Sequence, residues 1–188
     1  MKDKARPATA FLEQSDPDLS DTALLAQVAR RNENAFAMLV QRYRDRFYRV
    51  AQRMLRDADD ADDAVQLAFF RVFLRADAYR NEWKGSTWLY RVLINTCVDA
   101  CRKRKRAEEP GDGPQPSSGP DRAIERLDLA SALDKLPVEA RAVFLLCYSE
   151  ELSYREIARA RGITVNTVKT QLRRAKQLMR RHLKEAQR

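Results

Sequence analysis

The chain has 188 residues, and its composition of 44% hydrophobic and 34% charged residues is typical of a globular protein, not of a disordered or membrane-embedded one. A surplus of 36 Lys and Arg over 27 Asp and Glu favours a polyanionic partner, with nucleic acid first and an anionic membrane surface second. One histidine, five glycines and no glycine-rich phosphate loop argue against an enzyme, so we expect neither catalytic residues nor a cofactor.

Residues 1–19 contain Pro and Asp breakers without periodicity and are expected to form a flexible tail. This segment has no apolar signal core, and no run in the chain approaches the roughly 18 apolar residues that a membrane span requires. We therefore expect no membrane insertion and a cytoplasmic location. Residues 20–106 then keep helical periodicity almost without Pro or Gly, which predicts helices near 20–30, 33–56, 60–77 and 86–105.

The helix expected at 60–77 has two apolar faces. One is an ordinary core stripe that includes Val65, Phe69 and Val72. The opposite side carries Leu67, Phe70 and Leu74 beside Asp63 and Gln66. A helix with two apolar faces is either central in a core or docks a partner with its outer face. Four aspartates at its start disfavour full burial, so we favour a partner-binding face.

The loop that follows, residues 79–88, is dense in aromatic and polar side chains, and the next helix carries Arg91 and Asn95 before a basic run at 102–106. Aromatic rings interleaved with cations can hold unstacked single-stranded bases and their phosphates. Tyr79 and Trp88 could instead pack into the core, and for Trp88 the pattern does not decide between the two roles.

Residues 107–120 hold four of the seven prolines and three of the five glycines, which predicts a linker. Beyond it, residues 121–188 resume the helical pattern, with helices expected near 121–134, 138–149, 153–160 and 165–183. The fold class is therefore all-α, with two small helical domains on a flexible tether.

The last two predicted helices have the lengths and the short connecting turn of a helix-turn-helix. Ser153 and Glu156 form a capping-box pattern, Gly162 can take the positive φ of the turn, and Thr164 is a candidate N-cap. In the final helix, an apolar stripe faces the core, and polar and cationic residues lie opposite. Because that face holds almost no acids, we expect it to contact DNA and not simply water. The candidates for base contacts are Asn166, Lys169, Thr170, Arg173 and Arg174, and those for phosphates are Arg180, Arg181 and Lys184.

Cys97 and Cys101 lie one helical turn apart, and Cys147 and His182 lie elsewhere, so a metal-sensing role is a formal alternative. A four-ligand set would have to cross both domains, and we favour buried reduced thiols without a metal. The pattern does not assign any of the three cysteines a redox role.

Three stretches resemble the minimal two-domain, extracytoplasmic-function (ECF) sigma factors of bacterial RNA polymerase. They are residues 62–69 (DDAVQLAF), residues 87–91 (TWLYR), and the segment from Leu136-Pro137 through 152–158 (LSYREIA) to 167–170 (TVKT). The order and spacing of these stretches carry the resemblance. It implies a promoter-recognition factor without enzymatic activity.

The resemblance assigns roles to individual residues. It implies that the outer face of the 60–77 helix docks on the clamp helices of the largest polymerase subunit, through Asp63, Gln66, Leu67 and Phe70. It implies single-stranded contacts to the promoter −10 element by Tyr79, Arg80, Trp88, Arg91 and Asn95, and double-stranded contacts to the −35 element by the base-contact candidates of the final helix. Leu67 stands where the family usually has Glu, and Asn166 where it usually has Gly. An inhibitory anti-sigma protein is a further implied partner.

A self-sufficient helix-turn-helix regulator is the alternative from another class. It would account for residues 121–188 but not for the second apolar face at 60–77 or the aromatic loop.

Overall fold

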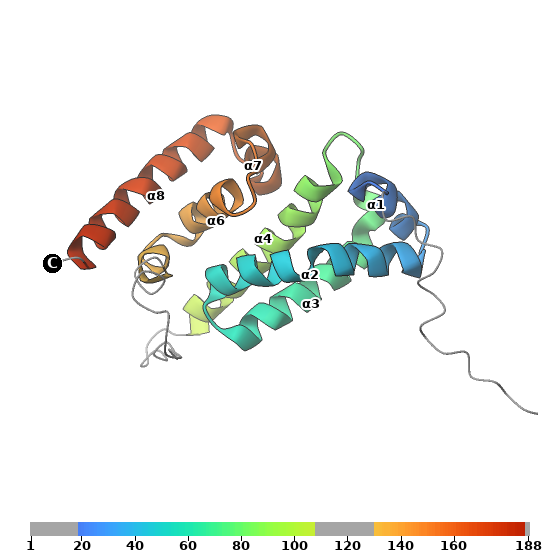
Figure 1. Ribbon diagram of the computed structural model, residues 1–188, viewed down its shortest axis with the longest axis horizontal. Coiled ribbons are helices and arrows are strands. Elements are labelled where there is room, and N and C mark those ends of the chain that lie inside the picture. Colours follow the sequence, from blue (N-terminus) through green and yellow to red (C-terminus); the bar gives the residue numbers. More distant parts are fainter. Residues whose placement is uncertain (1–18, 108–129, 187–188) are drawn as a thin grey trace, which may run out of the picture.

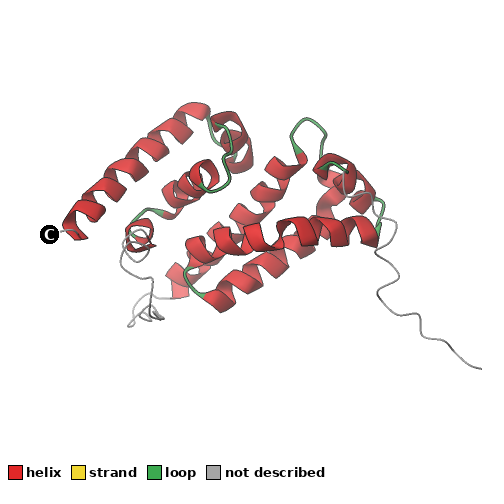
Figure 2. Ribbon diagram, viewed as in Figure 1, coloured by secondary structure: helices red, strands yellow, loops and turns green. Residues whose placement is uncertain are grey.

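The computed structural model describes residues 19–107 and 130–186, and within these ranges the regular structure is entirely helical (Figure 2). Its elements are α1 (Asp21–Ala29), α2 (Glu33–Leu55), α3 (Ala58–Arg75), a 3-10 turn η2 (Ala76–Ala78), α4 (Gly85–Ala107), α6 (Val138–Tyr148), α7 (Tyr154–Arg161) and α8 (Val165–Ala186). Residues 130–134 are also helical. We call α1–α4 the first half and residues 130–186 the second half.

The helix starts follow from local capping. Ser20, Asn32 and Asp57 each accept a hydrogen bond from a backbone N–H in the first turn of α1, α2 and α3. Such caps satisfy donors that the helix itself cannot pair. The predicted helix at 60–77 differs most from the structure, because it begins at Ala58 behind the Asp57 cap and tightens into a 3-10 turn after Arg75.

Aromatic rings fill the centre of the first half. Phe47 of α2 stacks on Phe69 of α3 with ring centroids 5.1 Å apart and contacts Tyr90 of α4 at 5.5 Å. At the start of α4, Gly85 lies so close to α1 that an added Cβ would be 2.8 Å from Asp21. Glycine at this position lets α1 and the start of α4 meet.

The helix-turn-helix predicted for the second half is confirmed. Ser153 and Glu156 form the capping box, Gly162 adopts φ +65°, and Thr164 Oγ1 accepts from the backbone N–H of Thr167 at 3.1 Å. Behind it, the stripe formed by Val168, Leu172, Ala175 and Met179 is buried. The whole of α8 is therefore held from one side, against α6 and α7.

The sequence predicts two domains on a tether, but the structure packs the second half against the first. Helix α6 lies between α8 and α4, and α7 contacts α4 (Figure 1). Arg141 of α6 is buried and donates from Nη1 to the Met54 carbonyl of α2 at 2.8 Å. Most of the proposed linker and residues 121–129 lie outside the described residues, so the domain boundaries stay a prediction.

Candidate protein and nucleic-acid interfaces

The outer face of α3 is the largest exposed apolar feature of the first half. Phe70 is 58% exposed, Leu74 46% and Leu67 43%, whereas Phe69 on the other side is buried. The alternative of a fully buried central helix is therefore wrong. Exposed apolar side chains grouped on one helix face are typical of a protein-docking surface.

Polar residues border this face on the N-terminal side. Gln66 Nε2 donates to Asp62 Oδ2 at 2.5 Å, and Asp63 is exposed one position further along. Acidic side chains in the first turn suit the positive end of the helix dipole. The four residues predicted to bind polymerase, Asp63, Gln66, Leu67 and Phe70, are thus all exposed on one helix.

The loop after α3 places its aromatic residues differently from the prediction. Trp88 is only 8% exposed, and its ring lies 5.8 Å from that of Tyr79. The Tyr79 hydroxyl donates to the Trp83 carbonyl at 2.5 Å and lies 3.0 Å from Thr22 Oγ1. Trp88 therefore packs in the core in this structure, and its assignment as a −10 contact stays a prediction. Tyr79 is half-buried and organises the loop.

Trp83 is the loop residue that the sequence analysis did not single out. Its ring is half-exposed, and the guanidinium of Arg91 lies over it, 4.9 Å from the ring centroid. Arg80 is exposed at the start of the same loop. A ring with a cation over it provides a surface for stacking and for phosphate binding. Trp83 lies in the loop and Arg91 in α4, eight positions later. Helical periodicity does not extend across the loop, so it could not have predicted this contact.

Asn95 lies further along α4, and its side-chain oxygen already has a hydrogen-bond partner in the protein. Its Oδ1 accepts a hydrogen bond from Arg161 Nη1 of α7 at 2.6 Å. The residue predicted to touch a base is therefore half-buried at the contact between the two halves. Arg161 is a second residue that the sequence analysis missed, because no local pattern connects two positions 66 residues apart.

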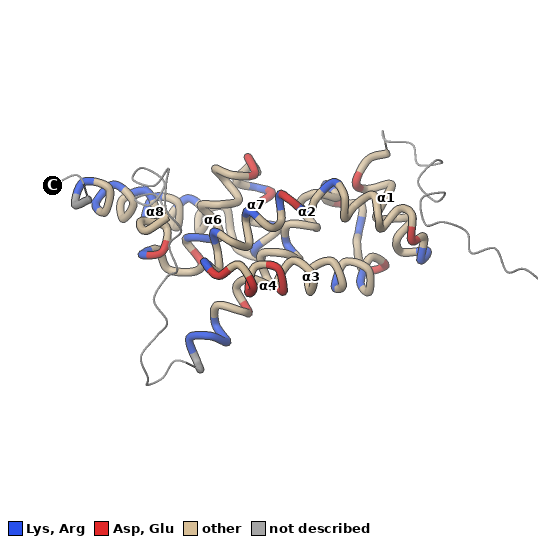
Figure 3. The backbone as a smooth tube through the Cα atoms, turned by 60° about the horizontal axis from the view of Figure 1, so that its bottom comes forward, with Lys and Arg blue, Asp and Glu red and all other residues tan. Residues whose placement is uncertain are grey.

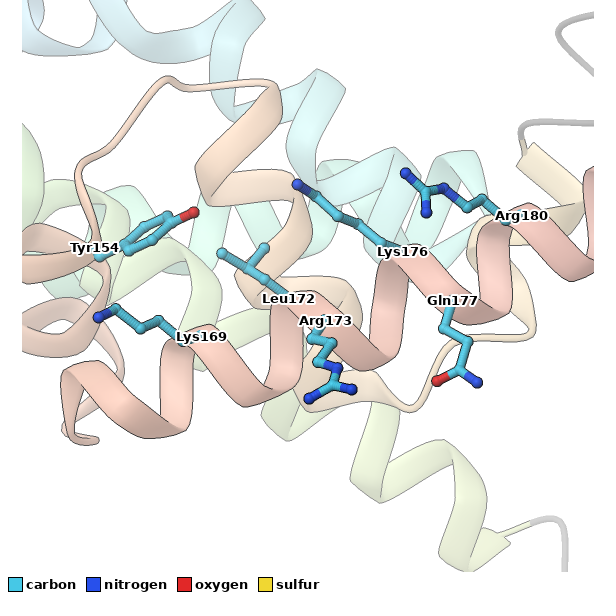
Figure 4. Close-up of a pocket in the computed structure, with 7 residues that line it drawn as sticks. All are labelled: Tyr154, Lys169, Leu172, Arg173, Lys176, Gln177 and Arg180. Atoms are coloured by element: carbon cyan, nitrogen blue, oxygen red, sulfur yellow. The ribbon is translucent and has the colours of Figure 1, made fainter.

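The outer face of α8 is open to solvent. Asn166, Lys169, Thr170, Arg173 and Arg174 are all exposed, as predicted for base-contact candidates. Lys169, Arg173, Gln177 and Arg180 also line a shallow groove of about 480 Å³, together with Tyr154 of α7 and Lys176 (Figure 4). Lys176 Nζ lies 5.3 Å from the centroid of the Tyr148 ring.

Cations continue to the end of α8 and recur at the end of α4 (Figure 3). Arg180, Arg181 and Lys184 are exposed on the last turns of α8. A helix with hydrogen-bonding groups near its N-terminus and cations further along has the side chains that a major-groove helix uses for base edges and then for phosphates.

The cysteines are not arranged as a metal site. Cys97 and Cys101 are buried in α4, and burial raises the pKa of the Cys97 thiol to about 12. Among the described residues, no three His, Cys, Asp or Glu side chains lie close enough together to hold a metal ion. In the same part of the chain, no helix is long and apolar enough to cross a membrane.

Family models match both halves of the chain. Residues 39–107 match the model described as Sigma-70 region 2, and residues 126–179 match that described as Sigma-70, region 4. The first spans α3 and α4, and the second spans the helix-turn-helix.

Similar proteins, found both by sequence and by structure, indicate the same family. The chain is 34% identical over 182 residues to the ECF RNA polymerase sigma factor SigW of Bacillus subtilis (strain 168), covering 86% of this chain and 95% of SigW. The structure of CnrH in complex with the cytosolic domain of CnrY is similar at a TM-score of 0.69 and 27% identity, over 90% of this chain and 99% of CnrH. The sigma factor RpoE in complex with the anti-sigma factor NepR from Bartonella quintana has the same fold, with a TM-score of 0.69 and 21% identity over 79% of this chain and 96% of RpoE. The chain therefore belongs to the ECF family of RNA polymerase sigma factors.

Proposed function

We propose that the chain binds core RNA polymerase and directs it to a set of promoters, where it recognises the −35 element as duplex DNA and the −10 element as single strand. The observation that carries this proposal is the pairing of two unlike exposed surfaces in one chain: the apolar face of α3 and the cationic face of α8. A protein dock and a DNA-reading helix are both needed to recruit an enzyme to a sequence. We assign the chain no reaction chemistry of its own and place its action with polymerase in the cytoplasm.

Each surface has a proposed target. The face formed by Asp63, Gln66, Leu67 and Phe70 docks on the clamp helices of the largest polymerase subunit. Arg80, Trp83 and Arg91 capture −10 bases and phosphates, with Asn95 joining them once Arg161 releases it. The α8 face reads the −35 element, and its last turns contact phosphates.

The proposed division of the chain is a region-2 domain at 20–106, a linker at 107–120 and a region-4 domain at 121–188. Similar solved structures support a further partner, because the sigma factor RpoE was solved with the anti-sigma factor NepR and CnrH with the cytosolic domain of CnrY. We therefore propose an anti-sigma protein as a third partner besides polymerase and promoter DNA.

Reconstitution tests the function. The purified chain is added to sigma-free core polymerase on fragmented genomic DNA of the source bacterium, and initiation sites are mapped by sequencing transcript 5′ ends. We expect new, sharply positioned initiation sites that share an upstream motif and depend on both chain and polymerase. A self-sufficient regulator would instead bind duplex sites without polymerase and add no initiation sites, which would contradict the proposal.

A further inference from the structure

We propose that the first turn of α1 positions the loop between Tyr79 and Gly85 for −10 bases, with Thr22 as a positioning residue for Trp83. The inference rests on the proposed function, because it gives a role in base binding to a helix that does not itself touch DNA. Helix α1 lies outside residues 39–107, which match the region-2 model, so that match assigns α1 no role.

The loop is tied to α1 at both of its ends. Helix α1 contacts the 3-10 turn that precedes the loop and the helix α4 that follows it (Figure 1). At the start of the loop, the Tyr79 hydroxyl lies 3.0 Å from Thr22 Oγ1. At its end, a Cβ on Gly85 would lie 2.8 Å from the Asp21 side chain and from the Thr22 backbone nitrogen. Any larger residue at position 85 would push the loop away from α1, so the loop begins and ends on the same helical turn.

Two hydrogen bonds in series connect α1 to the backbone of Trp83. The Tyr79 hydroxyl has one proton, which it donates to the Trp83 carbonyl at 2.5 Å. The same hydroxyl can therefore only accept from Thr22, so Thr22 Oγ1 is the donor in their contact. A hydroxyl that accepts a hydrogen bond is polarised into a better donor. Thr22 thus strengthens the bond that fixes the Trp83 backbone.

The turn of α1 that bears Thr22 is itself fixed by α2. Asp21 accepts from Arg42 Nη1 at 2.7 Å and from the Tyr43 hydroxyl at 2.5 Å. Ser20 accepts from the backbone N–H of Ala23 and caps the helix. Because α2 packs against both α3 and α4, these bonds connect the loop through α1 to the helical bundle of the first half.

Trp83 is the residue through which this positioning reaches the proposed base site. Its ring is half-exposed, and the guanidinium of Arg91 lies 4.9 Å from the ring centroid. Arg91 belongs to a long helix, whereas Trp83 lies in the loop, so the ring stays under the guanidinium only if the loop backbone is fixed. A binding loop that is ordered before its ligand arrives binds more tightly, since association then costs less conformational entropy. Thr22 therefore raises the affinity for bases without contacting them.

A double-mutant cycle tests whether Thr22 acts through Tyr79. The full chain is assembled with core polymerase, and binding is measured to a single-stranded oligonucleotide that carries the −10 sequence of a promoter mapped in the reconstitution. Thr22→Val keeps the side-chain shape and removes the hydroxyl, so affinity should fall about two- to ten-fold, the range of one net hydrogen bond. Thr22→Ser keeps the hydroxyl and should match the parent. In a Tyr79→Phe background, Thr22→Val should cause no further loss, because the series of hydrogen bonds is already broken.

Hydrogen exchange of the backbone amides separates positioning from a general loss of stability. Thr22→Val should exchange several-fold faster than the parent in the loop at 79–85 and at the parent rate in α2 and α3. Thr96→Val is the matched control, because it removes a buried hydroxyl of α4 that bonds Arg71 and not the loop. It should leave loop exchange and oligonucleotide affinity at the parent values even if its melting temperature falls. If Thr22→Val does not fold, Tyr79→Phe should show the same faster exchange in the loop.

The outcomes distinguish this inference from the proposed function. Parent-like affinity and parent-like loop exchange in Thr22→Val, with initiation by the parent chain intact, would overturn the inference alone. An equal loss in Thr22→Ser, or losses that add in the double variant, would also overturn it, because the Thr22 hydroxyl would then not act through Tyr79. Failure of the parent chain to initiate with core polymerase would overturn the proposed function, and the role of the loop with it.

Discussion

The two halves of the molecule present their functional side chains to solvent in different ways. In the second half, α8 packs with one stripe against α6 and α7, and its cationic face is exposed along its length. In the first half, α4 is covered on two sides, by the bundle of α1–α3 and by the second half. Its Asn95 is held by Arg161 and its Trp88 is buried, whereas Arg91 stays exposed.

The outer faces of α3 and α8 are exposed to solvent, whereas α4 also packs against the second half. Substitutions on the outer faces of α3 and α8 should therefore act directly on binding of polymerase or DNA. Substitutions on α4 should change both the DNA contacts and the packing between the halves. Variants of two residues that share one helix or loop but differ in burial or in proposed role should therefore behave differently.

Phe69 and Phe70 give the largest expected contrast, because they lie side by side on α3 and yet the first is buried and the second exposed. Phe69→Ala removes the ring stacked on Phe47 and should destabilise the fold by about 3–5 kcal/mol. Phe70→Ala should leave the melting temperature nearly unchanged and weaken association with core polymerase by about 2 kcal/mol or more, as for an interfacial aromatic anchor. Thermal melts and polymerase-binding titrations measure the two effects. A sharp melting-temperature drop in Phe70→Ala without a binding loss would place Phe70 in a core.

Arg173 and Arg181 make the corresponding comparison within α8. Arg173→Ala should cost about 1–3 kcal/mol at the promoter and relax base preference at one upstream position, and Arg174→Ala should act similarly. Arg181→Ala should weaken all promoters alike and lower the salt slope of binding by about one. Binding of the polymerase complex to promoter variants over a salt series distinguishes them. Equal losses on every sequence for Arg173→Ala would mean that this face contacts only phosphates.

Trp83 and Tyr79 test the loop of the first half. Trp83→Ala should lose about 1–3 kcal/mol of single-strand binding, because it removes the half-exposed stacking ring under Arg91. Tyr79→Phe keeps its ring and loses only the hydroxyl that bonds the Trp83 carbonyl, so its effect should be smaller. Permanganate reactivity of promoter thymines reports the opened strand. Normal reactivity with Trp83→Ala would exclude this pair as the base-binding site.

The smallest expected effect is a pH dependence of the packing between the two halves. Glu150 faces Tyr90 of α4 and Arg46, Arg49 and Arg53 of α2, and burial raises its pKa where the halves are packed together. A raised pKa means that the packed arrangement binds this proton more tightly, so Glu150 favours packing at lower pH and less so as pH rises through the raised value.

Glu156 contributes with the opposite sign and in another pH range. Partial burial alone would raise its pKa, but hydrogen bonds from Lys84 and Ser153 lower it to about 2. Only the Lys84 contact crosses between the halves, so the part of this lowering that favours their packing is present at neutral pH and is lost in strongly acidic solution, where Glu156 becomes protonated. Mild acidification from neutral pH should therefore strengthen the packing of the two halves in the parent chain more than in Glu150→Gln, as measured by thermal melts. Weaker packing of the parent on mild acidification would contradict this assignment.

Local patterns predicted those features whose cause is local. The two faces of α3 follow from helical periodicity, which separates Phe70 from Phe69 by the 100° rotation of one residue. The capping box at Ser153 and Glu156 and the left-handed Gly162 are likewise determined by neighbouring residues, so the sequence located the helix-turn-helix.

Features that depend on distant parts of the chain were missed. Trp88 and Trp83 differ by five positions in one aromatic segment, yet only packing against the rest of the first half determines that the former is buried and the latter half-exposed. Arg161 shares α7 with the exposed Arg155 and Arg159, but its own side chain is buried and pairs with Asn95 of α4. The packing of the halves against each other is the sum of such long-range pairs, and no periodicity encodes it.

Run-off transcription from a promoter library randomised in the upstream element tests most directly whether one chain joins a polymerase dock to a DNA-reading helix. The parent chain, Phe70→Ala and Arg173→Ala are compared with core polymerase at several chain concentrations. We predict that Phe70→Ala lowers output from every promoter by the same factor and recovers at high concentration. Arg173→Ala should change which bases are preferred and should not recover. Loss of base preference in Phe70→Ala, or output from the parent chain that is independent of upstream sequence, would contradict the account.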